Sequence, residues 1–576
     1  MRARGRSGPR RSLMRQPWKG NLMSVRTGTG RHHCLTALCL TAALGGSAAW
    51  AEDWTIDGRT LTVEQVAGIA RDDGARIVLT QGADTQIAQG FALVMEAALQ
   101  GKAVYGLTVG VGWNKDRPVF AIKDGKRVLD DELLQLSRAF NLTSLRAHGA
   151  GVGEPMPVEA VRAGMAIRLN QIATGRTGVQ PAVAEMYRQF LERGITPVVP
   201  SRGSVGEADI TLASHIGLAM IGEGEVFVNG DRMAARQALS DAGIAPLEPV
   251  GKDFLSILST NALTAGHAAL LAHDVDAYLD KEAIVFALAL EGFNGNVAPF
   301  LSETNDIRPF PENLAGARAI RDALQGSYLW SPSDERALQD PLSFRTMAYV
   351  LGGARVATQD LVKVLEIQIN HSDDNPGVVV GAVDEKTSAQ VSAYFIEGEV
   401  AGAIYPTAGF EMLPVATSVE ALNAALVRLS QAITMQTIRF ENPEMTHLPR
   451  FLAAETNHGH AFGAIQKPLV ALLAENRQIG AQAPAGSVAM AGNIEDLDSH
   501  APLSVANLGR ILDNLYWMSS IQLLHAAQAV DLRKRPALGR ATKNLLDDYR
   551  RHVPFVDKDR IYSEDFAAGR RILMER

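Results

Sequence analysis

The chain has 576 residues, of which 47% are hydrophobic and 21% are charged. That length and balance are typical of a globular protein with a large core, and they disfavour both a disordered chain and a protein that spans a membrane many times. The formal net charge is −7.

The first 51 residues differ in composition from the rest of the chain. They contain nine Lys or Arg residues and no acidic residue, and they end in an apolar run from Cys34 to Ala51. A basic stretch, an apolar run and small residues just before Glu52 are typical of a secretory signal peptide. We expect a signal peptide over residues 1–51, with Met23 as an alternative start, and a periplasmic or secreted mature protein. An uncleaved membrane anchor is the alternative.

Removal of that segment makes the protein strongly acidic. Without its nine basic residues, 47 of the 56 basic residues remain against 63 acidic residues, a net charge of −16. An acidic surface disfavours nucleic acid and anionic membranes as partners, so we expect no nucleic-acid binding and no stable membrane association after signal cleavage. Both cysteines, Cys34 and Cys39, lie in the signal segment. The mature protein is therefore predicted to have no disulfide and no cysteine ligand or nucleophile.

In chain order, the mature sequence begins with loops and ends with long helices. Glycine and proline cluster at 105–118, 149–157 and 200–206, which predicts loops between helices. A short hairpin is predicted where Val226-Phe227-Val228 precedes Asn229-Gly230. Further on, apolar residues recur on one face of two predicted helices: Leu422, Leu426, Leu429 and Ile433, then Leu508, Leu512, Leu515 and Met518. We expect a mainly α protein, with a loop-rich domain over 52–255 and a helical bundle over 256–576.

Five segments in a fixed order are together more specific than any single short motif. They are Tyr105-Gly106-Leu107-Thr108-Val109-Gly110-Val111-Gly112, Ala147-His148-Gly149-Ala150-Gly151-Val152-Gly153-Glu154-Pro155, Gly203-Ser204-Val205-Gly206-Glu207-Ala208-Asp209, Gln339-Asp340-Pro341-Leu342-Ser343-Phe344-Arg345 and Asn493-Ile494-Glu495-Asp496. This series resembles the histidine and aromatic amino acid ammonia-lyase family, over roughly residues 60–530. The resemblance implies an ammonia-lyase/fumarase-like long helical bundle, and a homotetramer whose active sites combine loops from three subunits.

The resemblance also implies roles for residues in these segments. Tyr105 is expected to be the base that removes the β-proton, which requires a pKa shifted from about 10. Glu495 is expected to face the active site as a second catalytic residue, and His148 to lie beside the substrate ring. Arg345, with Gln339 close by, is expected to bind the substrate carboxylate through its planar guanidinium.

Further residues between these segments are expected to contact the substrate. Phe410 would line the ring pocket, and Glu411 stands where histidine ammonia-lyases have a histidine, which adds a carboxylate able to hold a cationic group. The family's Leu-Asn-Gly-Thr is here Leu258-Ser259-Thr260-Asn261. We expect Ser259 and Asn261 on the substrate side of the site.

The third segment departs from the family pattern. The family reads Gly-Ser-Val-Gly-Ala-Ser-Gly-Asp, and its Ala-Ser-Gly cyclises into a methylidene-imidazolone electrophile. This chain continues from Gly206 with Glu207, Ala208 and Asp209, one residue shorter and without that serine and glycine. Cyclisation needs an unhindered glycine nitrogen, and β-branched Val205 follows the one serine in this loop. We therefore predict that the methylidene-imidazolone is absent and that the protein has no cofactor.

An amine is a poor leaving group unless an electrophile helps it to depart. A quaternary ammonium leaves as a neutral tertiary amine and needs no electrophile. The leading hypothesis is therefore a lyase that eliminates an amine from an aromatic or imidazole amino acid or its betaine to give an acrylate, as in the cofactor-free branch represented by ergothionase. The substrate would be a small amino acid or betaine.

Three alternatives remain open at this point. A conventional histidine or aromatic amino acid ammonia-lyase would need another route to the electrophile. A non-catalytic periplasmic ligand-binding protein on the same scaffold would keep the ligand contacts without turnover. A metal-dependent enzyme is least favoured, because the sequence has no His-x-x-x-His or similar ligand cluster.

Overall fold

The computed structural model describes residues 53–111, 131–481 and 486–575. The predicted signal peptide, with Cys34 and Cys39, lies outside the described residues. Residues 51–576 form one compact unit.

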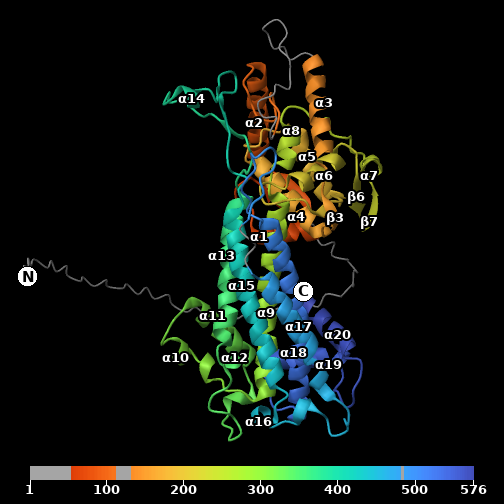
Figure 1. Cartoon of the computed structure of the whole chain (residues 1–576), viewed down its shortest axis with the longest axis vertical. Helices are drawn as coiled ribbons and strands as arrows, with labels where there is room; N and C mark the ends of the chain where they lie inside the picture. The colour runs from red at the N-terminus through yellow and green to blue at the C-terminus, as the bar shows by residue number, and fades with distance from the viewer. Residues whose placement is uncertain (1–52, 112–130, 482–485, 576) are drawn as a thin grey trace, which may run out of the picture. The chain divides into compact units, whose positions relative to one another are not determined.

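Four long helices form the centre of this unit: α9 (Ala262–Phe293), α13 (Met347–Ile369), α15 (Leu413–Arg439) and α18 (Ala501–Leu532). Figure 1 shows them running side by side, and α9, α15 and α18 pack against one another. Each of α9 and α18 has 32 residues, which corresponds to about 48 Å. Both predicted apolar stripes are buried, on α15 and α18 respectively. The predicted mainly α bundle is confirmed.

The segment Asp253–Phe293 is apolar because it is surrounded by protein. By length and composition it is the one stretch of the described residues that could cross a membrane, and 89% of its most apolar window is buried inside the protein. A core helix of a soluble fold passes the same test when its whole surface is covered.

Shorter helices pack around this bundle. They are α10 (Ser302–Asn305), α11 (Pro311–Ala323), α12 (Leu342–Arg345), α16 (Pro443–Thr446), α17 (Gln466–Ile479), α19 (Arg540–His552) and α20 (Tyr562–Met574). Helix α11 packs on α9 and α13, and α20 packs on α18.

The N-terminal half contributes eight helices among its described residues: α1 (Val63–Arg71), α2 (Gln81–Leu99), α3 (Asp131–His148), α4 (Val158–Ala173), α5 (Pro181–Glu192), α6 (Ile210–Met220), α7 (Ala235–Asp241) and α8 (Asp253–Leu258). Helix α4 is buried almost throughout and packs against α9, α1 and α5. The domain boundary predicted at residue 255 falls inside α8.

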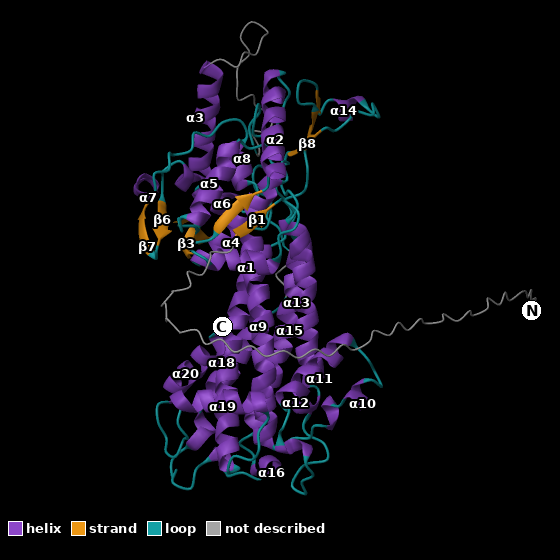
Figure 2. Ribbon diagram, turned by 180° about the vertical axis from the view of Figure 1, so that it is seen from behind, coloured by secondary structure: helices purple, strands orange, loops and turns teal. Residues whose placement is uncertain are grey.

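Short strands lie among these helices (Figure 2). They form parallel β1–β2 (Asp53–Ile56, Arg76–Leu79), antiparallel β3–β5 (Val152–Pro155, Pro200–Arg202), β4–β6–β7 (Thr196–Pro197, Glu225–Val228, Asp231–Ala234) and β8–β10–β9 (Gly377–Val380, Gly402–Tyr405, Phe395–Ile396). The predicted hairpin is β6–β7, and positive φ angles of 52° and 84° at Asn229 and Gly230 confirm its tight turn.

A buried carboxyl group lies between α9 and α18. Glu282 accepts hydrogen bonds from Ser519 Oγ (2.6 Å) and Tyr278 Oη (3.4 Å). Burial raises the pKa of Glu282 to about 8. A raised pKa means that the folded state holds this proton more tightly than the unfolded chain.

This proton makes stability depend on pH. The contribution of Glu282 is complete below its ordinary pKa of about 4.3 and is lost as the pH rises through about 8. We expect the melting temperature of Glu282→Gln to fall less between pH 5 and pH 9 than that of the parent, by on the order of a few degrees. Differential scanning fluorimetry across this range measures the difference. Glu64→Gln, on the exposed first turn of α1, is the control, and an identical pH slope in both variants would contradict the assignment.

Candidate active site

The loop from Gly203 to Asp209 leads directly into α6 and has an unusual backbone. Gly206 and Ala208 have φ angles of +95° and +68°. A Cβ atom at Gly206 would lie 2.1 Å from Ser499 Oγ, so this position requires glycine. The left-handed conformation costs an alanine about 1–2 kcal/mol. At Ala208, two hydrogen bonds hold this conformation: the backbone N–H donates to Asn261 Oδ1 (3.1 Å), and Ser204 Oγ donates to the carbonyl (3.3 Å).

Asn261 connects this loop to the segment before α15. Its Oδ1 accepts from Ala208, its Nδ2 donates to the Phe410 carbonyl (2.5 Å), and its own backbone N–H donates to Asp373 Oδ2 (2.8 Å). Asn261 is completely buried. The sequence predicts a substrate contact for Asn261, whereas the structure directs both ends of its amide to protein groups.

These contacts place two carboxyl groups side by side. The backbones of Glu207 and Glu411 pair as a single antiparallel β-bridge. Glu207 Oε1 accepts a hydrogen bond from the Ser499 backbone N–H (3.1 Å), and Glu411 Oε1 accepts from the Leu413 N–H (2.7 Å) at the start of α15. Burial and then the charge of Glu411 raise the pKa of Glu207 to about 7. Near neutral pH, Glu207 is therefore partly protonated.

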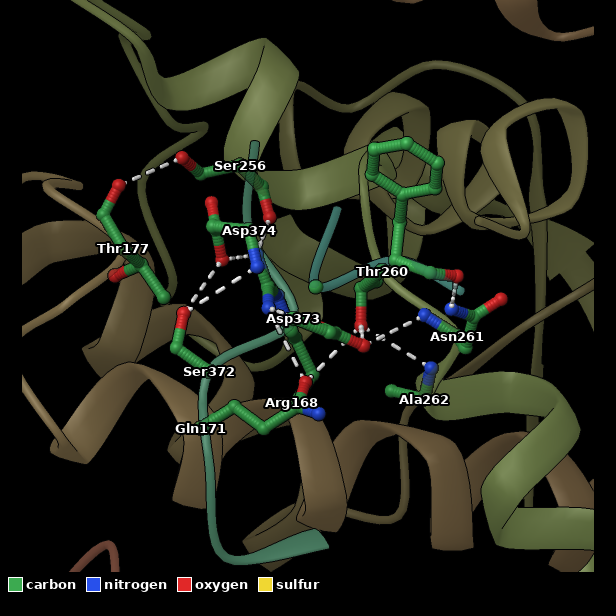
Figure 3. A network of polar contacts seen from close by, with 12 residues as sticks. Arg168, Gln171, Thr177, Ser256, Thr260, Asn261, Ala262, Ser372, Asp373 and Asp374 are labelled. Carbon is green, nitrogen blue, oxygen red and sulfur yellow. Dashed lines mark hydrogen bonds and ion pairs between the residues drawn. The ribbon is translucent and has the colours of Figure 1, made fainter. Parts of the chain in front are cut away.

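A network of buried charged residues contacts the Thr260–Asn261 turn (Figure 3). Arg168 forms ion pairs with Asp373 (3.0 Å) and Asp374 (2.7 Å), and Lys252 pairs with Asp374 (2.9 Å). Two cations and two anions balance, and all four side chains are at most 2% exposed. Asp373 Oδ2 also accepts from Thr260 Oγ1 (3.0 Å), so the network reaches the Asn261 turn directly.

Asp209, the last residue of the loop, points away from the carboxyl pair. Its two oxygens accept from the Thr264 backbone N–H (2.9 Å) and Thr264 Oγ1 (2.7 Å) at the start of α9. Burial raises its pKa. Asp209 therefore anchors the loop to the bundle. Among Gly206, Glu207, Ala208 and Asp209, only Glu207 has a side chain directed to Glu411.

Tyr105 lies in a tight turn that packs against α8. The Gly106 N–H donates to the Val109 carbonyl (3.1 Å), and Tyr105 and Val109 form an isolated bridge. A Cβ atom at Gly106 would lie 2.3 Å from Leu255 Cδ2 on α8, which explains the glycine. Tyr105 is half-buried. Helix α8 ends at Leu258, with the buried Ser259 as its C-cap, and so leads from the Tyr105 turn to the Asn261 turn.

His148 is the last residue of α3, which packs against α6 and α8. Its Nδ1 lies 2.8 Å from the Ser144 carbonyl, so Nδ1 donates a hydrogen bond to that oxygen. The ring is half-buried.

Glu495 lies on the 486–500 loop before α18. Its backbone pairs with Met490, and Ala491, Gly492 and Asn493 have positive φ angles of 45°, 70° and 66°. The end of this loop contacts the 203–209 loop, because the His500 N–H donates to the Val205 carbonyl (2.9 Å) and Ser499 Oγ donates to the Gly206 carbonyl (3.0 Å). The structure therefore places Glu495 on a loop that is tied to Glu207.

Gln339 and Arg345 lie elsewhere in the same chain. Arg345 Nη1 donates to Gln339 Oε1 (3.0 Å), and both residues line a cavity of about 360 Å³. Arg345 precedes the N-terminal end of α13, whereas Asp373 follows its C-terminal end. The 23 residues of α13 span roughly 34 Å. One chain therefore brings Glu207, Asn261, Phe410 and Glu411 together, but not Arg345.

Two residues of this region, Ser499 and Asp373, are not among the site residues that the sequence predicts. Ser499 contacts Gly206 and Glu207 across more than 290 positions of sequence, and no local pattern marks such a contact. Within the described residues, no group of three or more His, Cys, Asp or Glu side chains is arranged to hold a metal ion.

A family model described as aromatic amino acid lyase matches residues 61–551. The chain belongs to the aromatic amino acid lyase family. Its relatives include the histidine ammonia-lyase of Treponema denticola, which is 30% identical over 521 residues, 90% of this chain and 96% of that protein. A histidine ammonia-lyase of Bacillus cereus is 29% identical over 518 residues, 89% of this chain and 95% of that protein.

Solved structures agree with this assignment. The ergothioneine-degrading enzyme ergothionase from Treponema denticola has a TM-score of 0.82 and 33% identity, and covers 91% of this chain and 98% of its own. Tyrosine aminomutase from Streptomyces globisporus has a TM-score of 0.78 and 28% identity, and covers 91% of this chain and 97% of its own. As an aromatic amino acid lyase, the protein is a carbon–nitrogen lyase whose reaction is an elimination of the ammonia-lyase type. An amino acid is the substrate class of this family.

Proposed function

We propose that this lyase eliminates a tertiary amine from the betaine of an imidazole or aromatic amino acid, without a methylidene-imidazolone. The observation that carries the proposal is the 203–209 loop, which has Glu207 and Ala208 where the family builds the electrophile. Ring closure at Ser204 would require the nitrogen of Val205 to attack the Gly203 carbonyl. That carbonyl accepts a hydrogen bond from Thr211 Oγ1 (2.6 Å), and Ser204 Oγ accepts from the Gly206 N–H (3.2 Å).

The proposed reaction needs no further reactant. The phenolate oxygen of Tyr105 takes the β-proton, the electron pair of the C–H bond forms the Cα=Cβ double bond, and the Cα–N bond breaks. A trimethylammonium group takes that bonding pair and leaves as neutral trimethylamine. The products are an acrylate and the amine, and a later transfer of the proton from Tyr105 to water restores the base.

The carboxyl pair favours a cationic leaving group. A quaternary ammonium keeps its charge at every pH and cannot donate a hydrogen bond, so a neighbouring carboxylate attracts it by charge alone. Glu411, where the family has a histidine, adds such a charge beside Glu207. The likeness to ergothionase supports the same substrate class.

Substrate binding would need a second copy of the chain. We propose a homotetramer in which Gln339 and Arg345 of one subunit complete the site formed by Glu207, Asn261 and Glu411 of another, with Arg345 binding the carboxylate. The separation along α13 supports this arrangement, because one chain holds the two groups roughly 34 Å apart. We also propose that the protein is secreted to the periplasm through the signal peptide predicted over residues 1–51.

A substrate comparison with identification of the released amine tests this function. The purified protein is incubated with ergothioneine, histidine, phenylalanine and tyrosine, the ultraviolet absorbance of the acrylate is followed, and the amine is identified. We expect trimethylamine from ergothioneine and no ammonia from the three amino acids. The intact mass is expected to equal that of the unmodified mature chain.

Two results would contradict the proposal. Ammonia release together with a mass lower by the water lost in ring closure would assign a conventional ammonia-lyase. Ligands that raise the melting temperature without any acrylate would assign a binding protein on the same scaffold.

A further inference from the structure

We infer that Asn261 is a positioning residue for the proposed elimination, because it joins the 203–209 loop to the 408–411 segment and thereby sets Glu207 beside Glu411. The inference rests on the proposed function. The family has a threonine where this chain has Asn261, and a threonine side chain is too short to bond both segments in the way that the amide does.

The Asn261 amide bonds both chain segments that carry the carboxyl pair. Asn261 Oδ1 accepts from the Ala208 N–H at 3.1 Å, and Nδ2 donates to the Phe410 carbonyl at 2.5 Å. These partners lie 53 and 149 positions away in the sequence. Each is the backbone of a residue adjacent to one member of the carboxyl pair, so the amide sets the separation of the two chain segments.

Asn261 is itself held in place by a buried ion pair. The backbone N–H of Asn261 donates to Asp373 Oδ2 (2.8 Å), and Asp373 is held by Arg168 (3.0 Å). Asn261 is completely buried and Asp373 is 1% exposed. A residue whose backbone is held on a buried ion pair has little freedom to follow a moving loop, so its amide acts as a fixed reference for both segments.

Charged groups from two neighbouring segments face Glu207. Glu411 approaches it from the 408–411 segment, and Asp498 approaches from the 486–500 loop, which also supplies the Ser499 N–H. Asp209 is turned to Thr264, and the imidazole Nε2 of His500 lies 3.2 Å from the Gly486 carbonyl. Burial and then the negative charges of Glu411 and Asp498 disfavour ionisation of Glu207 and raise its pKa to about 7.

The consequence is a site whose charge depends on the distance between the two segments. Near neutral pH Glu207 is partly protonated, and it gains its negative charge as the pH rises. A cationic betaine is bound better by the fully ionised pair, so kcat/KM should increase with pH through about 7. The rise of kcat/KM with pH is the acid limb of its pH profile. Loss of Asn261 would let the segments separate, lower the pKa of Glu207 and move this acid limb to lower pH.

The experiment compares pH profiles of kcat/KM for ergothioneine in the parent, Asn261→Ala, Asn261→Thr and Glu411→Gln. We expect both Asn261 variants to lower kcat/KM at least about tenfold at pH 8, and to move the acid limb down by about one pH unit. Glu411→Gln should move the limb in the same direction without disturbing Asn261. Asn423→Ala is the matched control, because it removes another buried amide, on α15, that donates to the Ser504 carbonyl.

Thermal stability separates this inference from the proposed function. In the parent, Glu207→Gln should reduce the dependence of the melting temperature on pH between pH 5 and 8. In the Asn261→Thr background, the same substitution should change that dependence little. This readout needs no turnover, so it holds even if no betaine is a substrate. An unchanged acid limb in the Asn261 variants, or equal effects of Glu207→Gln in both backgrounds, would overturn the inference and leave Asn261 a purely structural residue.

Discussion

Replacement of Tyr105 with phenylalanine is expected to lower kcat by about a thousandfold or more while ligand binding persists. The substitution removes one hydroxyl group and keeps the aromatic ring that packs against the core beside α8. General bases contribute typically 10²- to 10⁴-fold to a rate, so loss of the Tyr105 hydroxyl group should lower kcat by a factor in that range. Steady-state kinetics with ergothioneine measure the loss, and ligand-induced thermal shifts measure the binding that remains.

The control for this experiment is Tyr394→Phe, which removes a hydroxyl group that contacts Gln390 on an exposed part of the chain (3.1 Å). Its activity should stay within about twofold of the parent, as for most surface changes. Turnover by Tyr105→Phe at a rate near that of the parent would exclude Tyr105 as the base and favour Glu495 in that role.

Replacement of Arg168 with methionine is expected to destabilise the protein strongly. Methionine fills much of the volume, but it leaves Asp373 and Asp374 buried with Lys252 as their one remaining cationic partner. Removal of one member of a buried ion pair typically costs about 3–5 kcal/mol, because the remaining charge stays out of water. The Asn261 turn loses its support as well, so activity should fall together with stability.

Chemical denaturation followed by circular dichroism measures this effect. Arg188→Met is the matched control: Arg188 is 29% exposed and pairs with Glu185 and Glu192 on the same helix. Ion pairs at such exposed positions contribute about 0.2–1 kcal/mol. Equal losses in the two variants would show that the buried network adds no more than a surface pair.

The sequence by itself determined the helical class, the core faces of α15 and α18, and the β6–β7 hairpin. These features are local: apolar residues three and four positions apart define a helix face, and Asn229-Gly230 favours the positive φ angles of a tight turn. It also determined the family, because five motifs in a fixed order carry more information than any one of them. The other strands have two to four residues and follow no periodic pattern, so only tertiary pairing defined them.

Only the tertiary structure decided how the candidate site is assembled. Glu207 meets Glu411 and Ser499 across about 200 and 290 positions of sequence, and the Asn261 amide connects two loops that are distant in the sequence. The tertiary structure also separated Arg345 from these residues by the length of α13. The physical reason is that long-range contacts depend on how rigid helices place distant loops, whereas a sequence motif records only the residues that a loop contains.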